Sequence, residues 1–396
     1  MPLPFQRELD RLAGLGRTRA LLPAAGLDFS SNDYLGLAAH PALGQAVAQA
    51  LAEGLPVGSG GSRLLRGNHP AHQALETQAA AFFGTEAALY FNSGFDANLA
   101  LFSTLPSRHD HVIHDQFIHA SVKEGVRASL ARRKAVPHNN VSAFAQAVEQ
   151  ARRKGAQQVF VAVESLYSMD GDRAPLADLV NLARDQDAVL VVDEAHATGV
   201  YGPGGRGLAH ELDHGLGHGL DPERIICLHT CGKALGVSGG LVTGSRAMVD
   251  TLVNGARSFL FTTAASPLMA RAVSCALELS AQADEARARL ARLTALGRAR
   301  LEGLTRWRLL PGDTHILPVV VGTDSAAVWA AERLRTGGFD VRAIRPPTVP
   351  EGTARLRVSL NTQRTPEEVE ALARRILALE EEWAQDAGRN RNGEHL

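Results

Sequence analysis

The stretch AVLVVDEAHATG, residues 188–199, indicates the fold most directly. Its first five residues form a short, uncharged apolar run, which is typical of a strand buried on both faces of a sheet. Asp193 directly follows that run, and His196 comes three residues later. Further apolar runs of the same kind occupy 87–91, 159–163, 225–228 and 240–243. Because stretches of helix length separate most of these runs, we predict βαβ units, a mostly parallel sheet and an α/β fold.

The rest of the chain extends this pattern at both ends. Phe5, Leu9 and Leu12 have helical spacing and predict a short amphipathic helix over 4–15. An Ala/Leu/Arg-rich stretch after Pro267 predicts one long helical region that reaches about residue 309. Apolar runs that predict a second set of strands lie at 315–321, 341–344 and 355–360.

A final helix is predicted from Thr365 onward. Thr365, Pro366 and Glu368 form a capping sequence, and an apolar stripe follows at Val369, Leu372, Ile376, Leu379 and Trp383. We therefore predict three segments: an N-terminal arm (1–40), a large α/β domain (41–270) and a smaller α+β domain (271–396).

Composition excludes several classes of protein. Lys plus Arg is 41 and Asp plus Glu is 42, so the net charge of −1 argues against the broad basic surface that drives non-specific nucleic-acid binding. Three cysteines, Cys227, Cys231 and Cys275, do not form a disulfide framework. No secretory signal and no apolar run of about 18 residues is found, so we expect a soluble, cytoplasmic protein without a membrane partner.

Three polar segments follow predicted strands, at 164–172, 193–199 and 230–236. In a parallel sheet these ends share one edge, so Asp193, His196 and Lys233 are expected to meet in one crevice. A lysine there can form a Schiff base, and a buried carboxylate suits a protonated pyridine nitrogen. The alternatives are a structural salt bridge for Asp193 and a solvated surface position for Lys233.

The stretch YFNSGFDAN, residues 90–98, predicts a strand that enters a small-residue turn and then a helix. The free N–H groups and the dipole of such a helix start favour an anion. A capped helix without a ligand is the alternative.

Taken together, these segments resemble the α-oxoamine synthases, a family of fold type I enzymes that depend on pyridoxal phosphate (PLP). The resemblance runs nearly from end to end of the chain. Its motifs are SNDYLGL (31–37), GSGGSR (58–63), YFNSGFDAN (90–98), HASVKEG (119–125), SMDGD (168–172), VVDEAHATGVYGPGGRG (191–207), HTCGKALGVSGG (229–240), SFLFTTAASP (258–267) and IRPPTVPEGTARLR (344–357). The last motif is most similar to family members that act in biotin biosynthesis.

The resemblance implies four catalytic residues. Lys233 would hold PLP as a Schiff base and then serve as the general base. Asp193 would pair with the pyridine nitrogen, His196 would bond the ring hydroxyl, and His119 would stack on the ring and assist the acyl carbonyl. It implies further cofactor contacts from Gly94, Phe95, Ser168 and Thr230, and from Thr262 and Thr263, which would reach the phosphate of the neighbouring subunit in a homodimer.

The resemblance also implies the substrates. Asn32 and Arg357 would hold the amino-acid carboxylate, and Arg19 and Thr348 would contact the acyl chain, although Arg17 could fill the same role as Arg19. The implied reaction is decarboxylative condensation of L-alanine with pimeloyl-CoA or a pimeloyl-acyl-carrier protein, with PLP as cofactor. Glycine C-acetyltransferase, 5-aminolevulinate synthase and serine palmitoyltransferase activities stay open as alternatives inside the family.

Two functions of other classes are alternatives to this one. A metal hydrolase could use histidine clusters at His109, His111, His114 and His119, or at His210, His214 and His218, although Gly215, Gly217 and Gly219 disfavour a helix under the second cluster. A dinucleotide-binding GxGxxG pattern occurs at 202–207, but Pro203 and the lack of a strand directly before it argue against that site.

Overall fold

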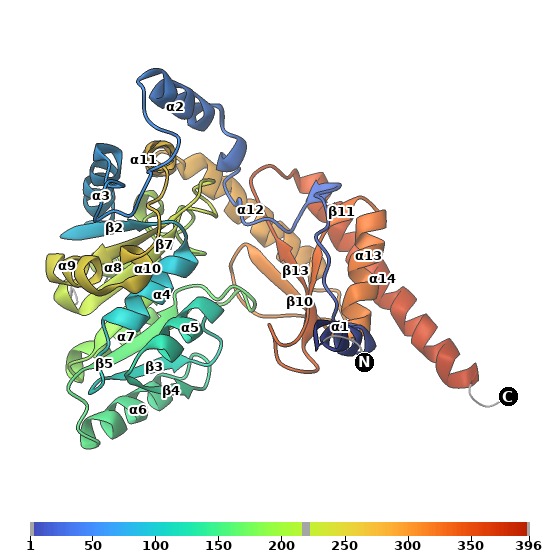
Figure 1. Ribbon diagram of the computed structural model, residues 1–396. Coiled ribbons are helices and arrows are strands. Elements are labelled where there is room, and N and C mark those ends of the chain that lie inside the picture. Colours follow the sequence, from blue (N-terminus) through green and yellow to red (C-terminus); the bar gives the residue numbers. More distant parts are fainter. Residues whose placement is uncertain (1–3, 216–221, 394–396) are drawn as a thin grey trace. The chain divides into compact units, whose positions relative to one another are not determined.

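The computed structural model describes residues 4–215 and 222–393. The chain divides into two compact units (Figure 1). Unit 1 comprises Met1–Ser31, Met169–Asp172 and Ala288–Leu396, and unit 2 comprises Asn32–Ser168 and Arg173–Arg287. Each unit has its own sheet and its own helices, and each is described by itself.

Unit 2 is built on a seven-stranded sheet with the order β2-β8-β7-β6-β5-β3-β4. The strands are β2 (Ala87–Phe91), β3 (His111–Asp115), β4 (Arg132–Val136), β5 (Val159–Glu164), β6 (Val189–Asp193), β7 (Ile225–Thr230) and β8 (Gly240–Gly244). Strands β4, β3, β5, β6 and β7 are mutually parallel, and β8 runs antiparallel to both β7 and β2. The predicted mostly parallel α/β sheet is confirmed, as are all five strands that the apolar runs indicated.

Strands β3 and β4 were not among the predicted ones. The sequence of β3 is HVIHD and that of β4 is RRKAV, so neither is a continuous apolar run. Strand β4 lies at the edge of the sheet with four of its five residues exposed, which explains its charged sequence.

Helices cover both faces of this sheet (Figure 1). The helices of unit 2 are α2 (Pro41–Ala52), α3 (Pro70–Phe83), α4 (Gly94–Thr104), α5 (Ala120–Ala128), α6 (Val141–Arg153), α7 (Leu176–Asp185), α8 (Leu208–Gly215), α9 (Arg246–Gly255), α10 (Arg257–Leu260) and α11 (Pro267–Ala281), of which α2 packs on α11. Helices α4, α5, α9 and α10 share one apolar core with alternate strand residues such as Phe160, Ala162 and Val242. Helices α6 and α7 contact β5 and β6, whose remaining residues are also buried. A sheet buried on both faces requires the apolar runs from which it was predicted.

Unit 1 contains an antiparallel sheet with the order β12-β13-β10-β9. Its strands are β9 (Arg308–Leu309), β10 (Ile316–Gly322), β12 (Arg342–Ile344) and β13 (Ala354–Ser359), and a short parallel pair joins β1 (Leu27–Asp28) to β11 (Phe339–Asp340). The helices are α1 (Pro4–Gly14), α13 (Asp324–Thr336), α14 (Pro366–Gly393) and most of α12 (Asp284–Leu301). The three predicted strands of this region and the predicted N-terminal helix are confirmed.

The helical stretch predicted after Pro267 consists of two helices and ends earlier than predicted. The chain forms α11, breaks at residues 282–283, forms α12 to Leu301 and then enters β9. Arg287 donates to the carbonyl oxygens of Ser280 (2.7 Å) and Gly199 (3.2 Å), so its guanidinium satisfies the end of α11. Composition alone does not mark this break, because both helices are rich in Ala and Leu.

The predicted start of the last helix is confirmed. The Thr365 N–H donates to the Glu368 carboxylate (2.9 Å), and the Glu368 N–H donates to the Thr365 hydroxyl (3.3 Å). These two bonds form a capping box. The apolar stripe from Val369 to Leu379 is buried in unit 1.

The limits of the two units differ from the predicted segments 1–40, 41–270 and 271–396. Helix α11 groups with unit 2 because it packs on α2 and α3. The first 31 residues group with unit 1, where β1 pairs with β11. In the described part of the chain, no helix combines the length and apolar character needed to cross a membrane.

Candidate active site

The carboxyl ends of three parallel strands form the candidate site in unit 2. The strand register places Glu164 of β5 beside Asp193 of β6, and Asp193 beside Leu228 of β7. Lys233 follows the end of β7 by three residues, and its Nζ lies 2.8 Å from Nε2 of His196. The structure therefore brings the three predicted polar segments together.

Asp193 is 5% exposed and its two carboxylate oxygens have separate partners. Oδ2 accepts a hydrogen bond from Nδ2 of Asn98 (2.8 Å), and Oδ1 accepts one from the Ala195 N–H (2.9 Å). The same Asn98 amide donates to the Ser121 hydroxyl (2.9 Å), which fixes its orientation. Because these donors are neutral, they hold the carboxylate in place without cancelling its charge, and it can still attract a cation.

His119 lies at the N-cap of α5, where its Nδ1 contacts the Ser121 hydroxyl at 2.8 Å. Its ring meets the ring of Phe95 edge to face, with the centroids 6.5 Å apart. Burial lowers the pKa of His119; the Asp193 carboxylate opposes this effect and the Lys233 ammonium adds to it. The His119 ring is therefore neutral near pH 7 and presents an uncharged face.

Glu164 is a second buried carboxyl group at the same sheet edge. Its Oε2 accepts from the Ser168 N–H (3.2 Å), and its Oε1 is buried without a partner. Burial raises the pKa of Glu164 to about 8, and the neighbouring Asp193 charge acts in the same direction. Glu164 thus holds a proton at neutral pH.

The start of α4 forms the third part of the site. Ser93 is the N-cap, and its hydroxyl accepts from the Asp96 N–H (3.1 Å). A Cβ on Gly240 would lie 2.8 Å from the Gly94 Cα, and a Cβ on Gly94 would lie 3.2 Å from the Thr230 hydroxyl. Two glycines therefore allow the start of α4 to approach the end of β7 closely.

Other predicted residues of unit 2 lie around this centre. Ser168 is buried after β5, and Phe95 is 45% exposed in the first turn of α4. Thr262 is half-buried and Thr263 is exposed, and the Thr263 carbonyl accepts from the Asn92 side chain (3.0 Å) just before α4.

Asn32 and Tyr34 approach the site through His196. The Tyr34 hydroxyl donates to Oδ1 of Asn32 (2.9 Å) and lies 2.6 Å from Nδ1 of His196. Tyr34 is fully buried and His196 is 5% exposed. The predicted carboxylate-binding residue Asn32 is thereby linked to Lys233 by hydrogen bonds.

The remaining predicted substrate residues belong to unit 1. Arg357 is buried on β13 and donates to the Ser359 hydroxyl (2.7 Å). Exposed Arg19 lies 3.5 Å from the Thr348 hydroxyl, so the two predicted acyl contacts are neighbours.

Arg17, the alternative to Arg19, has a different environment. Its guanidinium forms ion pairs with Asp324 (2.8 Å) and Glu351 (2.7 Å). Because Arg17 already pairs with two carboxylates of the chain, Arg19 stays the predicted substrate contact.

The residues of unit 2 fit a pyridoxal phosphate group. They supply an amine for a covalent bond, a fixed carboxylate for the pyridine nitrogen, a neutral imidazole for the ring face and a helix N-terminus for the phosphate. In addition, Oε1 of Glu164 is a buried polar atom at this edge of the sheet, and the chain supplies no hydrogen-bond partner for it.

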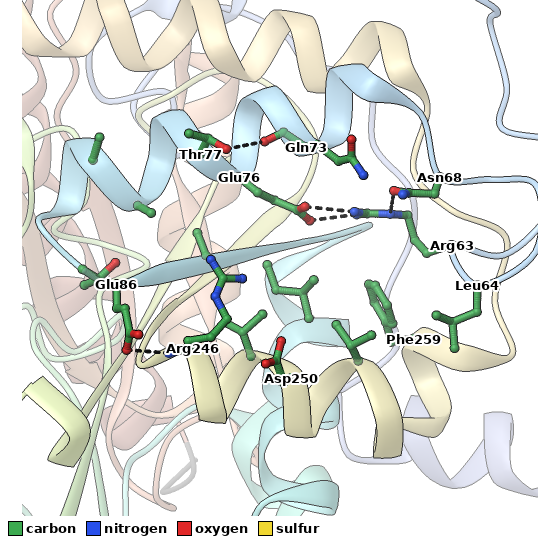
Figure 2. A pocket seen from close by; sticks show the side chains of 17 residues that line it. Arg63, Leu64, Asn68, Gln73, Glu76, Thr77, Glu86, Arg246, Asp250 and Phe259 are labelled. Atoms are coloured by element: carbon green, nitrogen blue, oxygen red, sulfur yellow. Dashed lines mark hydrogen bonds and ion pairs between the residues drawn. The ribbon is translucent and has the colours of Figure 1, made fainter.

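A separate pocket of unit 2 does not include this set (Figure 2). In it, Arg63 forms a two-pronged ion pair with Glu76 (2.8 and 2.9 Å), and Glu76 also accepts from the Tyr90 N–H (3.0 Å). Glu76 therefore links α3 to β2, and Arg63 of the GSGGSR motif pairs with that glutamate, which is a structural role.

The histidine clusters form no metal centre in the described residues. No group of three His, Cys, Asp or Glu side chains in that part of the chain could hold an ion. His114 instead contacts the Asp115 carbonyl (2.8 Å), and His210 contacts Arg206 (3.0 Å). His218 lies outside the described residues.

Four residues with clear positions in the site had no predicted role: Asn98, Ser121, Glu164 and Tyr34. Each lies inside or beside a segment that sequence reasoning singled out. Their contacts join residues that are far apart in the chain, such as Asn98 with Asp193, so spacing alone gave no signal for them.

Comparison with known proteins agrees with this geometry. The family model for aminotransferase class I and II matches residues 24–376. The chain belongs to the aminotransferase class I and II family. A member from Azoarcus sp. (strain BH72), an 8-amino-7-oxononanoate synthase, is 43% identical over 95% of this chain and 97% of its own. A second protein of that name, from Chromobacterium violaceum, is 45% identical over 87% of each chain.

Solved structures of other family members have the same fold. Serine palmitoyltransferase from Sphingomonas wittichii matches with a TM-score of 0.84 and 27% identity, and the match covers 95% of this chain and 96% of that one. The 8-amino-7-oxononanoate synthase from Francisella tularensis matches with a TM-score of 0.73 and 27% identity over 91% and 99% of the two chains. The expected fold type I architecture is confirmed.

Proposed function

We propose that this chain catalyses the PLP-dependent condensation of L-alanine with a pimeloyl thioester, carried by CoA or by an acyl-carrier protein. The products are 8-amino-7-oxononanoate, CO2 and the free carrier thiol, as in biotin biosynthesis. The observation that carries the reaction class is the set of Lys233, His196 and Asp193 at one sheet edge, with Lys233 Nζ 2.8 Å from His196. Identity above 40% over most of the chain to several 8-amino-7-oxononanoate synthases supports the choice of substrates.

When bound, PLP supplies an electron sink for the carbanion that forms at the α-carbon of the amino acid. Lys233 would hold the cofactor covalently through its amine, and as a free amine it would remove the α-proton of the amino acid. Asp193, fixed by Asn98 and Ala195, would keep the pyridine nitrogen protonated, a charge-assisted contact that contributes about 1.5–3 kcal/mol. The His119 ring would hold the face of the cofactor ring and assist the acyl carbonyl.

Four further residues would bind the substrates, as the resemblance implies. Arg357 suits the amino-acid carboxylate because its guanidinium can bind two oxygens at once. Asn32 would donate its amide N–H to the same carboxylate. Arg19 and Thr348, which are neighbours in unit 1, would contact the acyl substrate.

We also propose that the enzyme works as a homodimer. Val57 and Phe261 are 71% and 75% exposed and belong to two segments joined by a hydrogen bond from the Ser266 hydroxyl to the Val57 carbonyl (2.5 Å). We call Val57 and Phe261 the apolar edge. Burial of these two side chains against a partner would be favourable, and Phe261 directly precedes Thr262 and Thr263, the residues expected to reach the neighbouring subunit.

The test uses twelve reactions. Alanine, glycine and serine are each incubated with pimeloyl-, acetyl-, succinyl- and palmitoyl-CoA, and the products are identified by mass. Alanine with the pimeloyl thioester is expected to give 8-amino-7-oxononanoate at least tenfold faster than any other pair. The variant Lys233→Ala should fold, lose the absorbance of covalently bound cofactor and give no product.

Two other results would contradict the proposal. A faster reaction of serine with palmitoyl-CoA would assign the chain to the activity of its serine palmitoyltransferase neighbours and overturn the proposal. Normal turnover by Lys233→Ala would overturn the role of the lysine. Equal trials with pimeloyl-acyl-carrier protein decide which carrier delivers the acyl group.

A further inference from the structure

Two loops of unit 2 that belong to the motifs GSGGSR and SFLFTTAASP lie against each other. The first covers residues 57–63, and the second covers residues 261–266 between α10 and α11. We call the second one the threonine loop, because it contains Thr262 and Thr263. Three hydrogen bonds join the loops, each to a backbone carbonyl: from the Ser59 hydroxyl to Ala265 (2.5 Å), from the Ala264 N–H to Gly61 (2.9 Å) and from the Ser266 hydroxyl to Val57 (2.5 Å).

Helix α3 contacts both loops through two side chains. His72 is 0% exposed, and its Nε2 lies 2.8 Å from the Ala265 carbonyl oxygen of the threonine loop. Glu76, four residues later, forms the two-pronged ion pair with Arg63 at the end of the first loop (Figure 2). Because residues four apart lie on the same face of a helix, one face of α3 holds both loops.

The partners of His72 define where its hydrogen lies. Nδ1 accepts a hydrogen bond from the His69 N–H (3.2 Å), so this nitrogen carries no hydrogen. Nε2 faces a carbonyl oxygen, which can only accept, so Nε2 carries the hydrogen and donates it to Ala265. Burial lowers the pKa of His72, and the charges of Arg63 and His69 act in the same direction. The bond to Ala265 and the Glu76 carboxylate oppose this effect, and the ring is neutral near pH 7, as its two bonds require.

The threonine loop is also held from the opposite end of its backbone. The Asn92 side chain donates to the Thr263 carbonyl (3.0 Å). Each of the residues 263–265 therefore has a backbone group bonded to another segment of the chain, whereas the side chain of Thr263 is exposed. A fixed backbone under an exposed side chain lowers the entropy cost of a contact with a partner molecule.

Capping of α3 explains only one of the two bonds of His72. His69 and His72 form a capping box at the start of this helix, and that role uses Nδ1. The donor bond from Nε2 to Ala265 adds nothing to the cap. The two ring nitrogens therefore do two separate tasks, and substitutions can remove one task at a time.

We propose that His72 is a positioning residue that fixes the threonine loop through the Ala265 carbonyl, so that Thr262 and Thr263 are held in place for the PLP phosphate of the neighbouring subunit. What these threonines bind rests on the proposed function. The bond that fixes the loop concerns the single chain alone.

Two substitutions separate the tasks of the ring nitrogens. His72→Asn has an acceptor near the position of Nδ1, so it keeps the cap but removes the donor to Ala265. His72→Gln has an amide donor near the position of Nε2, so it keeps the bond to Ala265 but loses the acceptor for the cap. Hydrogen exchange of the purified protein, followed in peptides that cover residues 258–266, is expected to be faster than wild type in His72→Asn and unchanged in His72→Gln.

Gln78→Met is the matched control for a lost side-chain bond on the same helix. The Gln78 amide donates to α11, at the Ser274 carbonyl (3.1 Å) and the Glu278 carboxylate (3.3 Å). This variant should leave exchange in 258–266 as in the wild type. If His72→Asn fails to fold, Ser59→Ala replaces it, because that variant removes the other donor to the Ala265 carbonyl and carries the same expectation.

Cofactor binding then tests the consequence across the dimer. Equilibrium dialysis with PLP is expected to give a Kd roughly 3- to 10-fold higher in His72→Asn, the effect of losing one buried hydrogen bond. His72→Gln and Gln78→Met should bind PLP as the wild type does. A purely structural role as a helix cap predicts the reverse order, with His72→Gln more impaired than His72→Asn.

The failures can be told apart. The inference is wrong, whatever the activity, if exchange in 258–266 is unchanged in both His72→Asn and Ser59→Ala, or if His72→Gln is as impaired as His72→Asn. Faster exchange with an unchanged Kd for PLP would overturn the link from the loop to the phosphate. If exchange and PLP binding change as expected but alanine and the pimeloyl thioester give no product, the proposed reaction fails while the role of His72 stands.

Discussion

Two carboxyl groups at adjacent strand ends illustrate how single residues acquire different chemistry. Asp193 accepts from two N–H donors, whereas Glu164 has one donor and an unpartnered oxygen. Burial and the Asp193 charge together raise the pKa of Glu164 to about 8. Glu164 is therefore uncharged near pH 7, and Asp193 is the carboxyl proposed to pair with a pyridinium.

This difference predicts how stability changes with pH. The pKa of the Glu164 carboxyl is 4.5 in the unfolded chain and about 8 in the folded protein. At a pH between these two pKa values, only the folded state keeps the proton. Stability should be highest below pH 4.5 for this group and fall as the pH rises toward 8. Glu164→Gln removes this proton uptake, so the loss of unfolding free energy between pH 5 and 7.5 should shrink by about 1–3 kcal/mol.

Urea unfolding of the protein without cofactor, at a fixed protein concentration, measures this effect. Glu149→Gln makes the same chemical change at an exposed ion pair with Arg153 and should leave the pH dependence as in the wild type. An unchanged pH dependence in Glu164→Gln would show that this carboxyl is ionised in the folded protein.

At the scale of elements, the start of α4 combines a helix N-cap with the proposed phosphate site. Ser93 caps the helix through the Asp96 N–H (3.1 Å), and Gly94 lets the first turn lie against Thr230. The free N–H groups of a helix start attract a phosphate only while that turn keeps its shape. The cap and the proposed phosphate site are therefore coupled.

We predict that Ser93→Ala lowers the unfolding free energy by about 1 kcal/mol and weakens cofactor binding. Thr365→Ala is a matched control, since it removes the cap of α14 in unit 1 at a similar cost in stability. Cofactor affinity, measured by equilibrium dialysis with PLP, should fall about tenfold in Ser93→Ala and stay within twofold of wild type in Thr365→Ala. Equal PLP affinity in both variants would remove α4 from the phosphate site.

At the scale of the whole molecule, the two side chains of the apolar edge, Val57 and Phe261, are exposed in the single chain, and the proposed dimer would bury them. Its position next to Thr262 and Thr263 connects the proposed dimer to the proposed phosphate contact across the interface. Burying one phenylalanine side chain contributes about 1.5–3 kcal/mol, enough to change a dissociation constant roughly 10- to 100-fold.

Phe261→Glu is therefore expected to raise the dimer dissociation constant at least tenfold and to reduce PLP affinity with it. Sedimentation equilibrium measures the first effect and dialysis the second. Leu130→Glu places the same charge at a position that is 70% exposed between α5 and β4 and should leave the dimer intact. A Phe261→Glu protein that dimerises as tightly as wild type would exclude the apolar edge from the interface.

Much of the fold could be predicted because burial on both sheet faces demands continuous apolar runs, and five strands carried that pattern. The charged edge strand β4 did not, since one side of an edge strand meets water. The break between α11 and α12 was missed because the bonds of Arg287 that satisfy the helix end reach across 88 residues to Gly199 as well as locally.

The sequence by itself determined which residues make up the candidate site: a lysine, an aspartate and a histidine that directly follow apolar strands. Parallel strands place such residues at the same edge of the sheet. Tertiary structure alone decided their states. Three features depend on distances between segments remote in the chain: the donor from Asn98 to Asp193, the pairing of Arg17 with two carboxylates, and the contact of Tyr34 with His196 across 162 positions. Local pattern encodes burial and periodicity, whereas hydrogen-bond partners and charge states arise only when the folded backbone sets those distances.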